Sequence, residues 1–496
     1  MRWNIFSIQI ALIAFIVPSV VTSTATATTY HVGPTQPFAN FQALPDLVAG
    51  DLVLVDGGGA VYPGNINFFD EGHGTAAQPI ILRGIIINNQ RPVISGGTNC
   101  IRLDNDYYTL ENFEITGGTS RGIYTAGHGN VIRNCIVHDC PNHGILGGDG
   151  GSGDLLIEYT EIHHCGAGTQ NHQVYVATDN DEHPNATFRM QFCYLHHGNG
   201  GNNVKSRCGR NEIYYNWIEG AAFHELECIG ADPAGQSTPP QTVREDSDIV
   251  GNVLVKTNGS GLILRVGGDG TGASDGRYRF VNNTCVMFNG TQAVFRYQDI
   301  MESMECHSNV FFRAAGGGVR IYSDSLSEPI SGVAFAGTNN WIPTGSTFVP
   351  SQWTNTITGA SPGVANAAGF DFTPTSGGAL HDAGNPNPPT IPAHPIANPL
   401  FPPAFHPPPR VLMAVGAAHP RPVSGTIDIG ALEFAPRCTG DVTQDGIVNV
   451  NDLLAVINGW GPCPAPPGRC SADIAADGNV NVNDLLAVIN AWGPCL

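Results

Sequence analysis

Two short stretches near the C-terminus carry acidic and amide side chains at the spacing of a cation-binding loop. Each has oxygen-bearing residues at loop positions 1, 5, 9 and 12 and a glycine at position 6, where the chain must turn sharply. Such a loop holds Ca²⁺ through carboxylate, amide and carbonyl oxygens, the carbonyl coming from position 7. Ala475 at position 3 leaves the second loop one oxygen short, so we expect weaker binding there or a water in its place. The predicted calcium ligands are Asp441, Thr443, Asp445, Ile447, Asn449 and Asp452 in the first loop, and Asp473, Asp477, Asn479, Asn481 and Asp484 in the second.

A second set of chemically capable residues lies in the middle of the chain, on short β-rich runs. Side chains alternate along an extended strand, so Lys205 and Arg207 should face outward together, as should Glu225 and Glu227. The chain has only two lysines, Lys205 and Lys256, so a column rich in basic residues is unusual for it. The same alternation puts three arginines outward on later runs, Arg265, Arg296 and Arg320. Three histidines each immediately precede a run of this series and are expected to line the rim of the column: His143, His172 and His224.

A cationic column of this kind could bind an acidic polymer, and the family resemblance described below implies a uronic-acid polysaccharide that is cleaved by β-elimination. The proton at C5 of a uronic acid can be removed once a cation neutralises the carboxylate, and a lysine amine or a neutral histidine can accept it. We predict Lys205, Arg207 and Arg265 as catalytic residues, with Lys205 as the base and Arg265 neutralising the carboxylate. The expected substrate-binding residues are His172, His224, Arg296 and Arg320, and the expected ligands of a second metal, Ca²⁺ in the substrate groove, are Glu225 and Glu227.

Other interpretations of the same residues stay open. Lys205 or Arg207 paired with a glutamate of the adjacent rung would be no more than a surface ion pair. Glu225 and Glu227 lie on one strand face at roughly the spacing of hydrolytic carboxyl pairs, which suits a glycoside hydrolase. A C5-epimerase shares the proton abstraction of a lyase. A non-catalytic carbohydrate-binding or cell-surface protein would use the column for recognition alone.

Two histidine pairs, His163-His164 and His196-His197, raise the question of a zinc site. Each pair lies on a run where one member must face inward or into a turn. We therefore expect no metal at these pairs.

Repeating β-rich segments must position all of these residues. Two alternating strand series with Gly- and Asn-rich turns predict a parallel β-helix, whose rungs bury their apolar faces by stacking. A β-sandwich or propeller is the competing architecture, although neither predicts an inward asparagine on each rung. The longer runs start at Tyr108, Asn130, Leu155, Phe188, Asn211, Ser247, Tyr278 and Met304. Asparagines that could stack as a ladder at one corner of the coil are Asn112, Asn134, Asn216, Asn252, Asn283 and Asn309.

The pattern resembles the right-handed parallel β-helix proteins of the pectate lyase-like superfamily over residues 29–433. The opening YHVGPTQPFANF and GTAAQPIILRG are similar to their capping strand and first rungs, and SGTIDIGALEF resembles their last strand. The resemblance implies action on uronic-acid polysaccharides, with lysine and arginine in the roles given above, as in proteins resembling alginate lyase and chondroitinase B. The aspartate pattern of polygalacturonase-like members is missing, which favours a lyase. The proline-rich residues 350–422 would lie along the helix or form a disordered linker.

The two acidic loops belong to a unit that is repeated after 32 residues. Each loop continues into the sequence NDLLAVIN, an apolar helix suited to pack on its twin. This duplication resembles the dockerin module of secreted bacterial proteins, which implies calcium-dependent folding and a cohesin-like or cell-surface partner. We expect one disulfide within each copy, Cys438–Cys463 and Cys470–Cys495, because both pairs have the same separation.

The rest of the sequence predicts an exported protein in three parts. Met1 and Arg2, a short apolar stretch and an Ala-Thr-Ala site predict a signal peptide at residues 1–27, followed by the β-helix at 28–436 and the dockerin-like module at 437–496. The 13 cysteines suit an oxidising compartment, and the net charge of −20 disfavours nucleic acid as a partner. No segment suits a membrane span. We therefore expect an all-β protein with a small all-α calcium-binding tail, secreted or held at the cell surface.

Overall fold

The computed structural model describes residues 26–69, 72–231, 244–258, 260–271, 274–288, 293–297, 301–324, 332–434, 439–443, 447–463 and 470–494. The predicted signal peptide, Asp445, Cys438 and Cys495 lie outside the described residues, apart from the last residues of the signal peptide.

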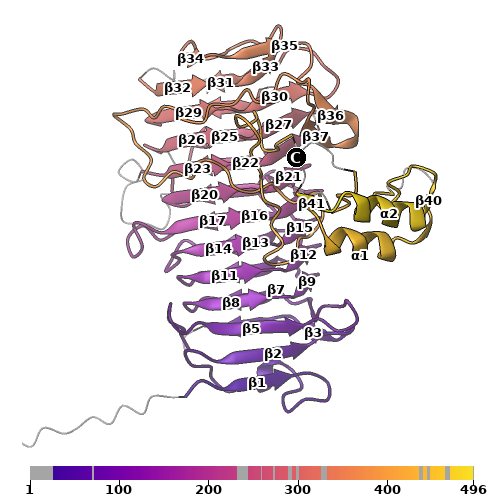
Figure 1. Ribbon diagram of the computed structural model, residues 1–496. Coiled ribbons are helices and arrows are strands. Elements are labelled where there is room, and N and C mark those ends of the chain that lie inside the picture. The colour runs from indigo at the N-terminus through magenta and orange to yellow at the C-terminus, as the bar shows by residue number, and fades with distance from the viewer. Residues whose placement is uncertain are drawn as a thin grey trace, which may run out of the picture.

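Three long parallel sheets form the body of the protein and run the length of one column (Figure 1). The first, sheet A, contains β1 (Thr29–Val32), β2 (Leu52–Asp56), β5 (Ile80–Ile85), β8 (Tyr108–Glu111), β11 (Asn130–Arg133), β14 (Leu155–Glu158), β17 (Thr187–Gln191), β20 (Arg210–Tyr214), β23 (Asp246–Val250), β26 (Arg277–Val281), β29 (Ser303–His307), β32 (Ala334–Thr338) and β34 (Trp353–Thr354).

Sheet B contains β3 (Val61–Pro63), β6 (Val93–Ser95), β9 (Glu114–Thr116), β12 (Ile136–His138), β15 (Glu161–His163), β18 (Tyr194–His196), β21 (Trp217–Glu219), β24 (Val253–Lys256), β27 (Thr284–Met287), β30 (Val310–Arg313), β33 (Trp341–Pro343) and β35 (Ile357–Gly359). Sheet C contains β4 (Ile66–Phe68), β7 (Asn99–Leu103), β10 (Arg121–Thr125), β13 (His143–Gly147), β16 (Val174–Ala177), β19 (Val204–Arg207), β22 (Leu226–Ile229), β25 (Leu264–Gly267), β28 (Phe295–Tyr297) and β31 (Tyr322–Asp324).

The remaining elements are short. They are the 3-10 helices η1 (Phe41–Ala43) and η3 (Ala367–Gly369), the antiparallel pair β36 (Val364–Asn366) and β37 (Asp371–Pro374), and the C-terminal elements β38 (Ile447–Val448), α1 (Val450–Asn458), β39 (Gly461–Pro462), β40 (Asn479–Val480), α2 (Val482–Asn490) and β41 (Gly493–Pro494). Among the described residues, no helix has the length and apolar character to cross a membrane.

The predicted right-handed parallel β-helix is confirmed, but each rung has three strands where the sequence indicated two strand series. Each longer run bends in its middle and contributes one strand to sheet A and the next to sheet B. The bend occurs at a residue with positive φ, such as Asn112 (69°), Asn134 (51°) or Tyr215 (56°). Asparagine tolerates this left-handed conformation better than most residues. The alternation of inward and outward side chains starts again after the bend.

The asparagine ladder is present, with one change of register. Side-chain amides of Asn216, Asn252, Asn283, Asn309 and Asn340 hydrogen-bond from rung to rung at 3.0–3.2 Å, and all five are fully buried. Asn112 and Asn134 bond to each other at 2.8 Å but occupy the left-handed bend itself, one place earlier in the rung. The prediction that all the asparagines share one place is therefore wrong for these two.

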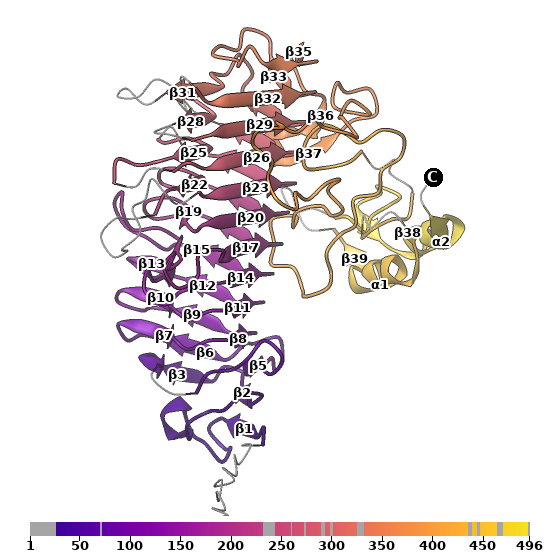
Figure 2. The same cartoon turned by 90° about the vertical axis from the view of Figure 1, so that its left-hand side faces the viewer.

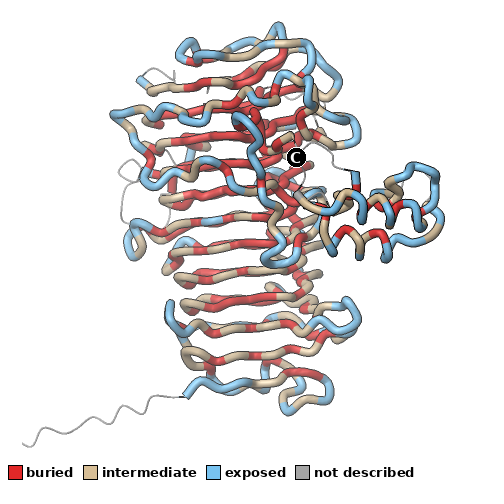
Figure 3. Tube along the Cα trace, in the orientation of Figure 1, coloured by how far each residue is buried: buried red, intermediate tan, exposed pale blue. Residues whose placement is uncertain are grey.

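Buried residues occur on the strands along the length of the column (Figure 3), and their apolar side chains form its interior. On sheet C, Val174, Val204, Leu226, Leu264 and Phe295 are successive register partners, and each is fully buried. Their neighbours along each strand must therefore face the outside of the sheet. This alternation is what positions the charged residues described below.

The proline-rich segment lies along the outside of the column, as one of the two alternatives predicted (Figure 2). The backbone N–H of Leu400 donates to Asp248 at 2.7 Å, and Arg410 forms an ion pair with Glu219 at 2.7 Å. The final SGTIDIGALEF stretch forms no strand, contrary to its resemblance, but its Asp428 carbonyl accepts a hydrogen bond from Asn282.

The C-terminal module lies beside the column, and its two helices pack against each other (Figures 1 and 2). Cys463 is bonded to Cys470, so the bridge joins the end of one copy to the start of the next. The predicted pairing within each copy is therefore wrong for these two cysteines. The nine cysteines of the β-helix are free and buried, as expected for small core residues.

Candidate functional site

Four charged residues stand in one outward column on successive strands of sheet C. Lys205 in β19 is the register partner of Glu227 in β22, which pairs with Arg265 in β25, which in turn pairs with Arg296 in β28. The structure thus brings together Lys205, Arg265 and Arg296 as the sequence predicted. Tyr175 in β16 precedes Lys205 in the same column, and its ring lies 5.3 Å from the Lys205 ammonium.

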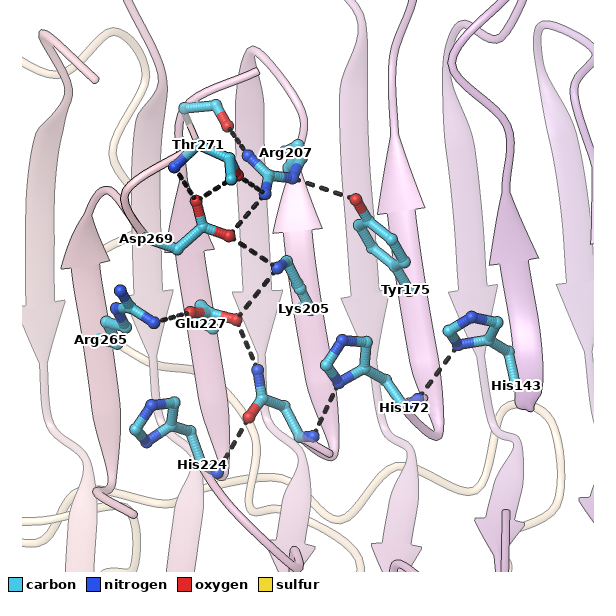
Figure 4. Close-up of polar contacts among 12 residues, drawn as sticks. His143, His172, Tyr175, Lys205, Arg207, His224, Glu227, Arg265, Asp269 and Thr271 are labelled. Atoms are coloured by element: carbon cyan, nitrogen blue, oxygen red, sulfur yellow. Dashed lines mark hydrogen bonds and ion pairs between the residues drawn. The ribbon is translucent and has the colours of Figure 1, made fainter. Parts of the chain in front are cut away.

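Asp269 ties the first two basic residues together (Figure 4). Its Oδ2 lies 2.8 Å from Nζ of Lys205 and 2.5 Å from a guanidinium nitrogen of Arg207. Although burial opposes ionisation, the charges of Arg207 and Lys205 hold the pKa of Asp269 well below its usual value. Asp269 lies in a glycine-rich loop after β25, where strand alternation makes no prediction, so the sequence did not reveal it.

Arg207 is anchored more firmly than a surface ion pair would require. It is 2 % exposed, and it donates to the carbonyl of Gly230 at 2.6 Å and to the phenol oxygen of Tyr175 at 3.0 Å. These bonds fix the Tyr175 hydroxyl beside Lys205. Arg207 therefore positions its neighbours from a buried place, and the predicted direct catalytic role for it loses support.

Glu227 links the lysine to the arginines. Its carboxylate lies 3.6 Å from Nζ of Lys205 and 2.9 Å from Nη1 of Arg265, and it accepts a hydrogen bond from Asn202 at 2.5 Å. Arg296, one rung further, has a buried Nε that finds no hydrogen-bond partner within the described part of the chain. Burial, and then the charge of Arg265, lowers the pKa of Arg296. Arg265 and Arg296 are thus two neighbouring cations on the C-terminal side of Glu227 in this column.

The three histidines form a hydrogen-bonded series at the edge of sheet C. Nδ1 of His143 accepts the backbone N–H of His172 at 3.0 Å, and Nδ1 of His172 accepts that of Asn202 at 2.8 Å. Nδ1 of His224 accepts the N–H of Leu262 at 3.0 Å. A neutral imidazole bonded in this way carries its proton on Nε2, so none of the three is suited to act as a base.

Burial keeps these histidines neutral. It lowers the pKa of His143 to about 4 and that of His172 to about 2, and it lowers that of His224 strongly as well. His224 is 1 % exposed and its Nε2 is buried, so its predicted contact with a substrate is not supported. His172 is 3 % exposed and packs edge-on against Tyr175, so any contact it makes would be at the margin of the column.

The predicted outward orientation of Glu225 is wrong. Glu225 precedes β22 and lies at a corner, where the alternation of a strand does not apply. It is fully buried, accepts a hydrogen bond from Asn203 at 2.6 Å and lies 3.4 Å from Nζ of Lys256. Burial raises the pKa of Glu225 to about 7, against the effect of Lys256. Glu225 and Glu227 therefore do not form the predicted second metal site.

Arg320 is also misplaced in the predicted column. The register partner of Arg296 in β31 is Ser323, whereas Arg320 precedes that strand. Its guanidinium lies 3.9 Å from the centre of the Phe348 ring, and its Nε donates to the Tyr322 carbonyl. Stacking on an aromatic ring thus draws Arg320 aside.

The two acidic loops have matching internal hydrogen bonds. In the first, the carboxylate of Asp452 accepts the backbone N–H groups of Thr443 and Asn449, each at 2.8 Å. In the second, Asp484 accepts those of Ala475 and Asn481, again at 2.8 Å. Both aspartates are fully buried, so the position-12 carboxylate closes each loop from inside.

The donor groups of these loops suit Ca²⁺. In the second loop, Asp473 accepts the N–H groups of Asp477 and Gly478, which folds the chain back on itself, and Gly478 has a φ of 85°. Carboxylate, amide and carbonyl oxygens are the ligands that Ca²⁺ prefers. Of the ligands predicted for the first loop, Asp445 alone lies outside the described residues.

Residues 439–492 match the family model of the Dockerin type I domain. The C-terminal module is a dockerin. Dockerin type I domains bind calcium in EF-hand-like loops and bind cohesins, and they occur in secreted or cell-surface bacterial proteins. In this dockerin the two loops just described occupy the matching region, and each leads into its helix through an asparagine cap.

The β-helix has distant structural relatives. Pectate lyase Pel9A is 11 % identical over 83 % of this chain and 98 % of its own, with a TM-score of 0.40. The PL6 family polysaccharide lyase Pedsa3628 from Pseudopedobacter saltans is 14 % identical over 66 % of this chain and 92 % of its own, with a TM-score of 0.37. The GH136 lacto-N-biosidase from Eubacterium ramulus is 14 % identical over 63 % of this chain and 67 % of its own, with a TM-score of 0.36. At these values the likeness says nothing of activity. No match is found among curated protein sequences.

Proposed function

We propose that this chain is an exported protein that binds an acidic polysaccharide along the sheet C column and cleaves it by β-elimination. The observation that carries the proposal is the adjacent, in-register placement of Arg265 and Arg296. Two guanidinium groups side by side repel each other, and an anionic ligand between them would remove that cost. A uronate carboxylate has the charge and the planar shape that a guanidinium recognises through paired hydrogen bonds.

The chemistry would proceed from that anchored carboxylate. Its neutralisation by Arg265 and Arg296 makes the C5 proton more acidic. The side-chain amine of Lys205 would take this proton, a C4–C5 double bond would form, and the C4–O4 bond would break. The Tyr175 hydroxyl, held by Arg207, would donate a proton to the departing oxygen. Asp269 and Glu227 would keep the Lys205 amine in place.

A glycoside hydrolase is the second candidate, because Glu227 and Asp269 both approach Lys205 within 3.6 Å. Hydrolysis with a carboxyl pair requires one of them to be a general acid with a raised pKa. The lowered pKa of Asp269 opposes that role for Asp269. Glu227 already faces the donors Lys205, Arg265 and Asn202, so it is poorly placed to donate a proton. Elimination therefore fits the charges of this site better.

The dockerin would bind two Ca²⁺ ions and attach the protein to a cohesin-like or cell-surface partner. This part of the proposal rests on the acidic loops and on the family match. No calcium is proposed for the sheet C column, since Glu225 is turned away from it.

Ultraviolet absorbance during incubation with a panel of uronic-acid polymers tests the reaction class. Elimination leaves a double bond conjugated to the carboxylate, which neither hydrolysis nor binding produces. A rise in absorbance on one polymer supports the lyase and identifies its substrate. Release of reducing ends without that rise would replace it with a hydrolase. Retention on a polymer gel with neither change would leave a binding protein.

A further inference from the structure

Five histidines gather on strands of sheet B and the turns that follow them, whereas the charged column belongs to sheet C. His138 in β12, His163 in β15 and His196 in β18 are successive register partners. Their rings stack with centres 4.9 and 4.8 Å apart. His164 and His197 follow two of them in the left-handed bends, with φ of 52° and 48°, and their rings stack at 5.3 Å. From the sequence, the turn at each pair argued against a metal site. In the structure, that turn brings the two imidazole rings of each pair into contact.

The nitrogens of these pairs approach unusually closely. Nδ1 of His163 lies 2.7 Å from Nδ1 of His164, and Nδ1 of His196 lies 2.6 Å from Nδ1 of His197. Two ring nitrogens at that distance must share a proton, or turn together toward a common cation, because two lone pairs repel. Nε2 of His196 also lies 3.0 Å from a carboxylate oxygen of Glu161.

Glu161, His163 and His196 each offer one ligand atom, and these three atoms lie within 4.8 Å of one another. Two ligands of one tetrahedral Zn²⁺ are about 3.3 Å apart, given Zn–N and Zn–O bonds of about 2.0–2.1 Å. The distance of 3.0 Å between Nε2 of His196 and the Glu161 carboxylate oxygen is close to that value. A rotation of the half-buried His163 ring would bring its nitrogen to the third ligand position. Three protein ligands with a fourth position open to water are also found at catalytic zinc sites.

We propose that Glu161, His163 and His196 form a binding site for a divalent transition metal, Zn²⁺ being the probe of choice, with His164 and His197 holding the two ligand imidazoles through their Nδ1 contacts. Imidazole and carboxylate together favour Zn²⁺ over Ca²⁺ or Mg²⁺, which prefer oxygen alone. The metal would clamp β15 to β18 from outside.

Isothermal titration of the full-length protein with ZnCl₂ tests this site, with excess Ca²⁺ present to fill the dockerin loops. We expect one equivalent of tightly bound Zn²⁺ in the wild type. The double variant His163→Asn/His196→Asn should lose at least 100-fold in affinity, and Glu161→Gln at least tenfold. His73→Asn is the control, because His73 is an exposed histidine outside the group of Glu161, His163 and His196.

Equal Zn²⁺ affinity in the wild type and the double variant would overturn the proposal, as would a wild type that binds no Zn²⁺. Thermal melting supplies a second readout, because a ligand that binds only the folded state raises the melting temperature. At one fixed Zn²⁺ concentration the rise should be equal for the wild type and His73→Asn, and smaller for Glu161→Gln. The single Glu161 variant keeps the test valid if the double variant fails to fold.

Discussion

Arg265 and Arg296 are register partners on β25 and β28, so two guanidinium groups stand on adjacent rungs of one outward column. Only one of them, Arg265, lies against the carboxylate of Glu227, at 2.9 Å. The protein carries a net charge of −20, yet it concentrates cations here. An arrangement that costs electrostatic energy in the free protein is expected where a ligand supplies the missing charge.

Replacement of Arg296 by glutamine should weaken retention on the recognised acidic polymer about tenfold or more, since a hydrogen bond to a charged group contributes about 1.5–3 kcal/mol. Arg320→Gln is the matched control, because its guanidinium stacks on Phe348 outside the column. Affinity electrophoresis at several salt concentrations measures both. Equal losses in the two variants would show that overall charge, and not the column, binds the polymer.

Lys205→Met should reduce polymer turnover by about 100-fold or more while leaving polymer affinity within a few-fold, since a general base contributes about that much. The assay is the rise in ultraviolet absorbance, with circular dichroism as the check of folding. Arg102→Gln, on the same sheet but at β7, should retain full activity. Unchanged turnover in Lys205→Met would reduce Lys205 to an ion-pair partner of Asp269 and Glu227.

Lys256→Met should destabilise the β-helix by about 3–5 kcal/mol, because it strands the fully buried Glu225 without its counter-ion. The double variant Lys256→Met/Glu225→Gln should recover part of that loss. Urea unfolding measured at pH 7 provides the comparison. If the single and double variants were equally destabilised, the two side chains would contribute independently and not as a pair.

His172 should make the β-helix less stable in acid. Its pKa is about 2 in the folded protein against about 6.5 when unfolded, so its contribution is complete above pH 6.5 and declines as the pH falls below that value. Between pH 7 and pH 5 this amounts to about 2 kcal/mol. The urea midpoint of His172→Gln should fall less over that interval than that of the wild type. His73→Gln, at an exposed position, should follow the wild type.

Asp441→Ala with Asp473→Ala should abolish the calcium dependence of the dockerin without affecting the β-helix. Both residues occupy position 1 of their loops, and loss of a carboxylate ligand weakens Ca²⁺ binding strongly. Limited proteolysis of the full chain with Ca²⁺ or with chelator measures protection of the module. Asn490→Ala, exposed at the end of α2 and beyond position 12 of the second loop, is the control. A wild-type module protected equally in chelator would contradict the calcium assignment.

The alternation of side chains along a strand made the sheet C column predictable. Residues outside strands do not follow that alternation, and the wrong or missing predictions concern such residues. Lys205 and Arg265 lie within strands, where every second side chain faces out, and both were placed correctly. Glu225 and Arg320 lie just before strands, where corner geometry and a nearby partner decide the direction. Asp269 sits in a loop that returns to the column from the following turn, so no local pattern could reveal it.

The repeat predicted the dockerin but not its disulfide. Matching cysteines in two copies indicate equivalent places in each unit, whereas a bond depends on which places meet in space. Here β39 of the first copy pairs with β40 of the second, which brings Cys463 near Cys470 across the junction. Sequence symmetry alone could not distinguish a bond within a copy from a bond between copies.

The asparagine ladder has a direction. From Asn216 to Asn309, each side-chain amino group donates to the carbonyl oxygen of the asparagine on the next rung, always toward the C-terminal end. The amide dipoles therefore add head to tail along one corner, and each bond polarises the next. One corner of the β-helix thus carries a line of aligned amide dipoles. Because this line has two different ends, the two ends of the column differ in electrostatic potential as well as in sequence.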